Sequence, residues 1–103
     1  MSESQPTYVR TPRVTARRVA GEMVLVPAAV RAADPNAKSA RLYVLNETAE
    51  RIWLLLDTTR TAAELARNLT AEYDTTGEQA RADVDAFLES MLAIGAVERR
   101  GGS

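Results

Sequence analysis

The chain has 103 residues, of which 46% are hydrophobic and 26% are charged, and its formal net charge at pH 7 is −1. This size and apolar content fit a single domain with a core of its own. Cysteine and histidine are both absent, which excludes disulfides, thiolate chemistry, the usual zinc sites and catalysis by a histidine base. We therefore expect a protein that is not an enzyme and that carries no cofactor or metal ion of its own.

The sequence also lacks the features of membrane and exported proteins. No apolar run is long enough to span a bilayer. Residues 1–13 are polar, contain two prolines and lack the apolar segment of a secretory signal peptide. We expect a cytoplasmic protein that binds no membrane, with a flexible N-terminal tail over residues 1–13.

The region after this tail is predicted to form about three short strands. Thr15–Val19 and Met23–Val26 are rich in β-branched residues, and Gly21-Glu22 between them is typical of a tight hairpin turn. An alanine-rich connector with a turn signal, Ala28–Ser39, precedes a third predicted strand at Arg41–Leu45. Because two or three short strands are marginal by themselves, we expect this sheet to pack against helices.

The first two predicted helices have clear start signals. Asn46 is a strong N-cap, and apolar residues then recur at helical spacing over about Glu47–Leu56. Thr61 is followed three residues later by Glu64, which is the pattern of a capping box. This pattern predicts a second helix that begins after Thr61 and ends near Tyr73.

A third helix is predicted over Gly77–Ile94. Thr76, followed three residues later by Gln79, again favours a capped start, and Gly95 is suited to end the helix. A short extended piece, Ala96–Glu98, is predicted to follow. The apolar stripe of the helix consists of Ala80, Val84, Phe87, Leu88, Met91 and Ile94.

The order of strands and then helices predicts the fold class. It is an α+β, winged-helix-like fold in which a small antiparallel sheet of about three strands is followed by a three-helix bundle. We expect this domain to span residues 14–98 and to be followed by a flexible C-terminal tail at residues 99–103.

Three segments, taken together in their order and spacing, carry a family resemblance. They are Tyr43–Ala49 with Ile52-Trp53; Leu56-Asp57 with Arg60-Thr61, Glu64–Ala66, Leu69 and Tyr73; and Asp83-Val84 with Phe87-Leu88, Leu92, Gly95 and Val97-Glu98. These segments resemble the PqqD family of peptide chaperones, also called RiPP recognition elements. The resemblance covers roughly Met23 to Glu98.

The resemblance implies a non-catalytic chaperone that binds the leader of a ribosomally synthesised precursor peptide. The leader would add as a strand to the third strand, over a groove walled by the third helix. A separate maturation enzyme, such as a radical-SAM protein or a leader peptidase, would then receive the peptide. Relatives serve pyrroloquinoline quinone (PQQ) and lasso peptide synthesis. The peptide-binding residues implied here are Arg41, Leu42, Tyr43, Val44, Leu45, Val84, Phe87, Leu88 and Met91.

Two other functions remain open on the sequence alone. One is a winged-helix DNA-binding regulator, whose recognition helix should carry basic or amide side chains towards phosphates and bases. The third predicted helix instead holds four acidic residues against one arginine, so we expect no nucleic-acid partner. The other is an accessory subunit that stabilises a larger biosynthetic enzyme and binds no peptide by itself.

Overall fold

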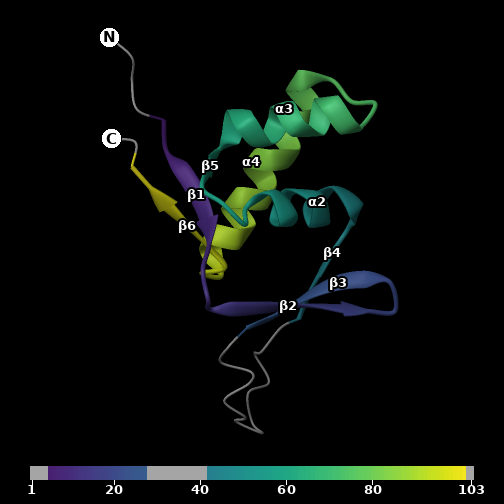
Figure 1. Ribbon diagram of the computed structural model, residues 1–103, viewed down its shortest axis with the longest axis vertical. Coiled ribbons are helices and arrows are strands. Elements are labelled where there is room, and N and C mark those ends of the chain that lie inside the picture. Colours follow the sequence, from purple (N-terminus) through teal and green to yellow (C-terminus); the bar gives the residue numbers. More distant parts are fainter. Residues whose placement is uncertain (1–4, 28–41, 102–103) are drawn as a thin grey trace, which may run out of the picture.

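The computed structural model describes residues 5–27 and 42–101 (Figure 1). Within these ranges the chain forms three helices and two three-stranded antiparallel sheets, one ordered β5-β1-β6 and the other β2-β3-β4. The α+β fold class is therefore confirmed. The elements in chain order are β1 Thr7–Arg10, β2 Val14–Val19, β3 Glu22–Pro27, β4 Tyr43–Leu45, α2 Glu47–Leu55, β5 Arg60–Thr61, α3 Ala62–Glu72, α4 Gly77–Ala93 and β6 Val97–Arg100.

The predicted sheet is present as β2-β3-β4, and one detail of its hairpin differs from the prediction. Val19 pairs with Glu22, so the turn between β2 and β3 is Ala20-Gly21 and not Gly21-Glu22. Both turn residues have positive φ, 53° at Ala20 and 86° at Gly21. Positive φ at both central residues is the geometry of a type I′ turn, whose twist matches that of the flanking strands.

The pairing of β3 with β4 decides which face of β4 meets the helices. Leu45 pairs with Met23, and Tyr43 pairs with Leu25; these four side chains pack in or against the core. Val44, one residue along, points the opposite way and is 57% exposed. The sequence alone left the two faces of this strand undetermined.

The second sheet, β5-β1-β6, corrects the expectation of flexible tails at both ends of the domain. Residues 7–10, which were predicted to belong to a flexible N-terminal tail, form the central strand β1. β1 pairs along its length with β6, from Thr7 opposite Arg100 to Arg10 opposite Val97. β6 therefore extends through Arg100, into the expected C-terminal tail. Strands β1 and β6, from opposite ends of the domain, therefore lie side by side (Figure 1).

The helix caps form largely as predicted. The Asn46 side chain accepts a hydrogen bond from the Ala49 N–H at 2.8 Å, and the capping box of α3 has both of its bonds. At α4 only half of such a box forms. Thr76 accepts from the Gln79 N–H at 3.0 Å, but the Gln79 side chain donates to Asp83 and does not accept from the Thr76 N–H.

The helices and the inner faces of the sheets enclose one core. Its largest fully buried side chains are Leu25, Ile52, Leu56, Leu65, Leu69 and Val84. The core brings together the predicted apolar stripes of all three helices. The predicted connector Ala28–Ser39 and residue Arg41 lie outside the described residues.

Candidate functional site

A groove of about 520 Å³ runs between β4 and α4, with α2 along its floor. Its lining is mostly apolar or neutral. The lining residues are Leu42, Tyr43, Val44, Leu45, Asn46, Thr48, Ala49, Ile52, Asp83, Ala86, Phe87, Ser90 and Met91. The groove thus combines a strand on one wall with a helix on the other.

Within residues 5–27 and 42–101, the strand wall of the groove is a free sheet edge. In the sheet order β2-β3-β4, β4 pairs with β3 and has no described strand on its other side. Such an edge presents backbone N–H and C=O groups that have no partner in the sheet, which makes it a template for another extended chain. Leu42, just before β4, is 59% exposed, and Val44, on β4, is 57% exposed. Apolar surface therefore accompanies this edge.

Two of the four α4 residues that were predicted to bind peptide lie in the helix wall of the groove. All four side chains are buried in the core, and of them only Phe87 and Met91 border the groove. The α4 residues that complete the wall are Asp83, Ala86 and Ser90. Residues 83, 86, 87, 90 and 91 recur at intervals of three and four, so helical spacing outward from Phe87 was the signal that could have found them.

On the strand wall, the structure brings together four of the five predicted residues. Leu42, Tyr43, Val44 and Leu45 all line the groove, while Arg41 is outside the described residues. The contribution of α2 was not anticipated. Thr48, Ala49 and Ile52 lie on the helix that continues directly from β4, and Ile52 gives the groove an apolar floor.

A family model decides the identification. The model described as "Coenzyme PQQ synthesis protein D (PqqD)" matches residues 22–97 of the chain. The chain belongs to the PqqD family. The match begins at β3 and ends at the start of β6, so it includes both walls of the groove. No curated protein matches the chain.

Two solved structures share the fold of this PqqD-family chain. A lasso peptide synthetase B1 complexed with the leader peptide is 24% identical, with a TM-score of 0.68, over 88% of this chain and 96% of that one. TbiB1 in complex with the TbiA(beta) leader peptide is 20% identical, with a TM-score of 0.67, over 87% and 94% of the respective chains. At these identities the likeness shows a common fold.

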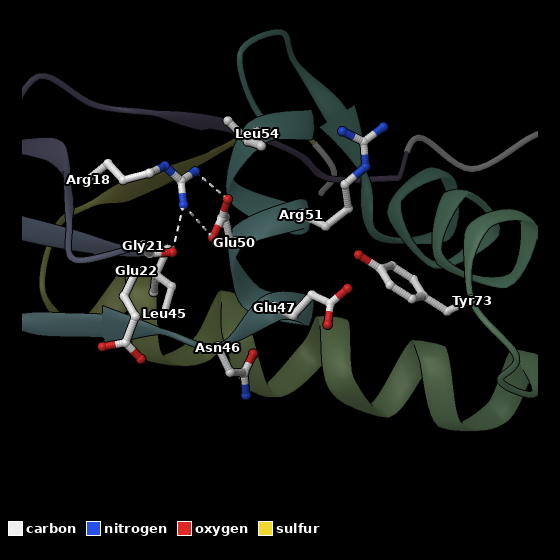
Figure 2. Close-up of a pocket in the computed structure, with 10 residues that line it drawn as sticks. All are labelled: Arg18, Gly21, Glu22, Leu45, Asn46, Glu47, Glu50, Arg51, Leu54 and Tyr73. Atoms are coloured by element: carbon white, nitrogen blue, oxygen red, sulfur yellow. Dashed lines mark hydrogen bonds and ion pairs between the residues drawn. The ribbon is translucent and has the colours of Figure 1, made fainter.

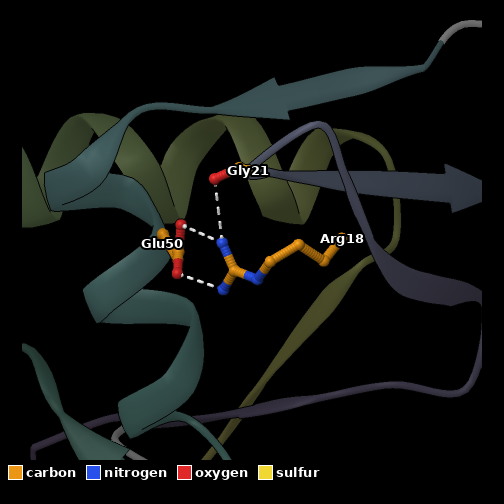
Figure 3. A network of polar contacts seen from close by, with 3 residues as sticks. All are labelled: Arg18, Gly21 and Glu50. Carbon is orange, nitrogen blue, oxygen red and sulfur yellow. Dashed lines mark hydrogen bonds and ion pairs between the residues drawn. The ribbon is translucent and has the colours of Figure 1, made fainter.

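A second depression, of about 460 Å³, lies where the β2–β3 hairpin meets α2 (Figure 2). Three of its five charged residues, Arg18, Glu50 and Arg51, take part in ion pairs. Arg18 of β2 pairs with Glu50 of α2 and also donates to the Gly21 carbonyl at 3.1 Å (Figure 3). Arg51 pairs with Glu72 of α3 at 2.6 Å. These ion pairs connect the β2–β3 hairpin and α3 to α2, the helix that lies beneath the groove.

The ion pairs also shift the pKa values of their members. The hydrogen bond from Arg18 lowers the pKa of the Glu50 carboxyl below its ordinary value, and the pKa of Arg18 is raised by the same bond. The hydrogen bond from Arg51 likewise lowers the pKa of Glu72. Both carboxylates therefore remain charged to lower pH than a free glutamate does.

Residues 5–27 and 42–101 contain no cluster of three or more Asp, Glu, Cys or His side chains that could hold a metal ion. In the same ranges no helix has the length and apolar character needed to cross a membrane.

Proposed function

We propose that this PqqD-family chain binds the leader of a ribosomally synthesised precursor peptide as an added strand on β4. The observation that carries the proposal is that β4, among the described strands, has a free edge beside a largely uncharged groove walled by α4. Family membership supports it, as does the leader peptide bound in each of the two structures of similar fold.

Backbone pairing alone is too weak to hold a leader on β4. Each added hydrogen bond contributes about 0.5–1.5 kcal/mol net, while ordering one peptide residue costs about 1–2 kcal/mol. The affinity must therefore come from apolar side chains of the leader that enter the groove. Each buried side chain of Leu or Phe size contributes about 1.5–3 kcal/mol, so two or three such anchors make binding favourable.

The groove has surfaces suited to such anchors. The buried side chains of Ile52, Phe87 and Met91 form its base, and Leu42 and Val44 add exposed apolar surface at the strand wall. Met91 adapts to side chains of different shape because its side chain is unbranched and polarisable. Side chains of an added strand alternate between two faces, so every second leader residue would point into the groove and the others towards solvent.

In this proposal the chain catalyses no reaction and holds no cofactor. It presents the bound precursor to a separate maturation enzyme, such as a radical-SAM protein or a leader peptidase. The charge of α4 argues against the DNA-binding alternative, because the helix over Gly77–Ala93 carries four acidic residues and one arginine. An acidic recognition helix repels the phosphate backbone.

The proposal is tested by titrating the ¹⁵N-labelled chain with synthetic leaders from short open reading frames that neighbour its gene. We expect saturable amide shifts confined to residues 42–45, α2 and the groove face of α4, together with slowed hydrogen exchange of β4 amides. A leader that binds but leaves the β4 amides unshifted and unprotected contradicts the strand-addition mode. The absence of shifts with every candidate favours the accessory-subunit function.

A further inference from the structure

Within residues 5–27 and 42–101, the lining of the groove holds one charged side chain among neutral ones, and this asymmetry points to a class of ligand. We propose that Asp83 selects leaders that carry a lysine or arginine two residues from an apolar anchor. This inference rests on the proposed function of the groove. It deepens that function by assigning the chemistry of the peptide.

Among the described residues that line the groove, Asp83 is the only one that is charged at neutral pH. It is partly exposed, and it lies on α4 one turn before Phe87. The other polar lining residues, among them Asn46 and Ser90, can bond to either sign of charge. A basic side chain is therefore favoured beside Asp83, and an acidic side chain at the same place is repelled.

The carboxylate of Asp83 is free to take a cationic partner. Within the described residues Asp83 forms no ion pair, and the hydrogen bond it accepts at 2.9 Å comes from the neutral amide of Gln79. Its neighbour Asp85 is already paired with Arg81 at 3.0 Å and does not line the groove. Of these two carboxylates, only that of Asp83, which forms no described ion pair, lines the groove.

The spacing of the α4 wall matches the repeat of an extended peptide. Asp83, Phe87 and Met91 are successive positions four residues apart, which places them about 6 Å apart along the helix axis. Side chains on one face of a strand recur every second residue, about 6.6 Å apart. A leader lying along the groove thus sets a basic residue at Asp83 and apolar residues at Phe87 and Met91.

This match predicts a motif in the leader. The motif is a Lys or Arg, any residue, an apolar residue, any residue and a second apolar residue, read in the direction in which the leader pairs with β4. The aliphatic stem of the basic residue can lie on the apolar floor while its charged end reaches the carboxylate. The apolar pair supplies most of the affinity, and the basic residue supplies selectivity.

A displayed library of random 12-residue peptides tests the motif without knowledge of the natural precursor. The library is selected on the full chain, on Asp83→Lys and on Glu89→Lys, a matched control. Glu89 is an exposed acid of the same helix that does not line the groove. We expect the wild type and Glu89→Lys to enrich Lys or Arg two residues from an apolar residue. We expect Asp83→Lys to enrich Asp or Glu there instead.

The selected peptides then allow a thermodynamic cycle. Replacing the enriched basic residue by Gln should weaken binding to the wild type about five- to tenfold, as for loss of a charge-assisted hydrogen bond. The same replacement should have little effect on binding to Asp83→Asn. Circular dichroism shows whether each variant is folded before its affinity is used.

The outcomes separate this inference from the function on which it rests. Peptides that shift β4 amides, yet show no basic preference or keep it on Asp83→Lys, overturn the role of Asp83 and leave the leader-binding function intact. A selection that yields no peptide that shifts the β4 amide signals overturns both the role of Asp83 and the leader-binding function.

Discussion

The guanidinium of Arg10 lies over the indole ring of Trp53, 5.1 Å from the ring centroid, and its Nε donates to the Trp53 carbonyl at 2.9 Å. Arg10 ends β1 and Trp53 belongs to the last turns of α2. This helix has no basic residue of its own in its last turn, where the carbonyl groups carry partial negative charge. A residue from the N-terminal strand therefore neutralises the C-terminal end of α2, the helix that forms the groove floor.

Replacing Arg10 with Met should lower the free energy of unfolding by about 1–3 kcal/mol. The substitution keeps an apolar stem but removes the cation over the ring and the hydrogen bonds to the helix end. Urea denaturation followed by tryptophan fluorescence measures the effect. Arg17→Met, at an exposed position in β2, is the control and should change stability by less than about 0.5 kcal/mol. Equal effects of the two substitutions would show that Arg10 stabilises nothing specific.

Filling the groove should block peptide binding without unfolding the protein. Ala86 lines the groove from α4 and is exposed, so Ala86→Trp places a large ring in the space of the leader. We expect affinity for a selected peptide to fall about tenfold or more, which corresponds to about 1.4 kcal/mol. Ala82→Trp is the control because Ala82 is exposed on the same helix but does not line the groove. Titration calorimetry that finds both variants equally impaired, or neither, would place the peptide elsewhere.

The hairpin turn contains a residue in an unfavourable conformation. Ala20 has a φ of 53°, a left-handed conformation that costs most L-residues roughly 1–2 kcal/mol and that Asn tolerates better. Ala20→Asn should therefore raise the free energy of unfolding by about 0.5–1 kcal/mol. Ala82→Asn, in the middle of α4, should lower it slightly because Asn is a poorer helix former than Ala. A loss of stability in Ala20→Asn would contradict the type I′ turn.

Gly95 is required by the turn that ends α4. It has a φ of 76°, and the bonds from its N–H to the Leu92 carbonyl and from the Ala96 N–H to the Met91 carbonyl form a Schellman motif. A Cβ added at Gly95 would also lie only 3.3 Å from the Cδ of Arg13. Gly95→Ala should reduce the free energy of unfolding by about 1–2 kcal/mol.

A matched glycine in the same helix provides the control for Gly95. Gly77, the first residue of α4, has open space around its Cα. Gly77→Ala should be neutral or slightly stabilising, since alanine has the higher helix propensity. Thermal denaturation of both variants under one set of conditions compares them, and similar losses would argue against a special backbone requirement at Gly95.

Because of the ion pair between Arg18 and Glu50, the free energy of unfolding should fall as the pH is lowered into the acid range. Its hydrogen bond lowers the pKa of Glu50 from the ordinary value of 4.5, so the folded state holds the charged form more strongly than the unfolded state does. This stabilisation is complete above the unfolded pKa and is lost as the pH falls from about 4.5 through the folded pKa. Glu50→Gln should therefore flatten the decline of stability with pH in that window. An unchanged slope in Glu50→Gln would remove the pair from this role.

Local signals account for the elements that the sequence predicted well. Asn46, Thr61 and Gly95 act on backbone groups within a few residues of themselves, so their caps could be assigned without knowledge of the fold. The same holds for the apolar stripes of the helices, since helical spacing is a property of the local sequence. The assignment of the leader-binding residues stays a prediction until a peptide is bound.

The sequence by itself determined the helices, the β2–β3–β4 strands and the family segments, because their signals lie within short windows. Only the tertiary structure decided that residues 7–10 form a strand, since β1 is specified by pairing with β6 about ninety residues away. It also decided that Phe87 and Met91 border the groove while Val84 and Leu88 do not, although all four are buried. All four belong to one apolar stripe, and which of them borders the groove depends on where β4 and α2 lie against α4.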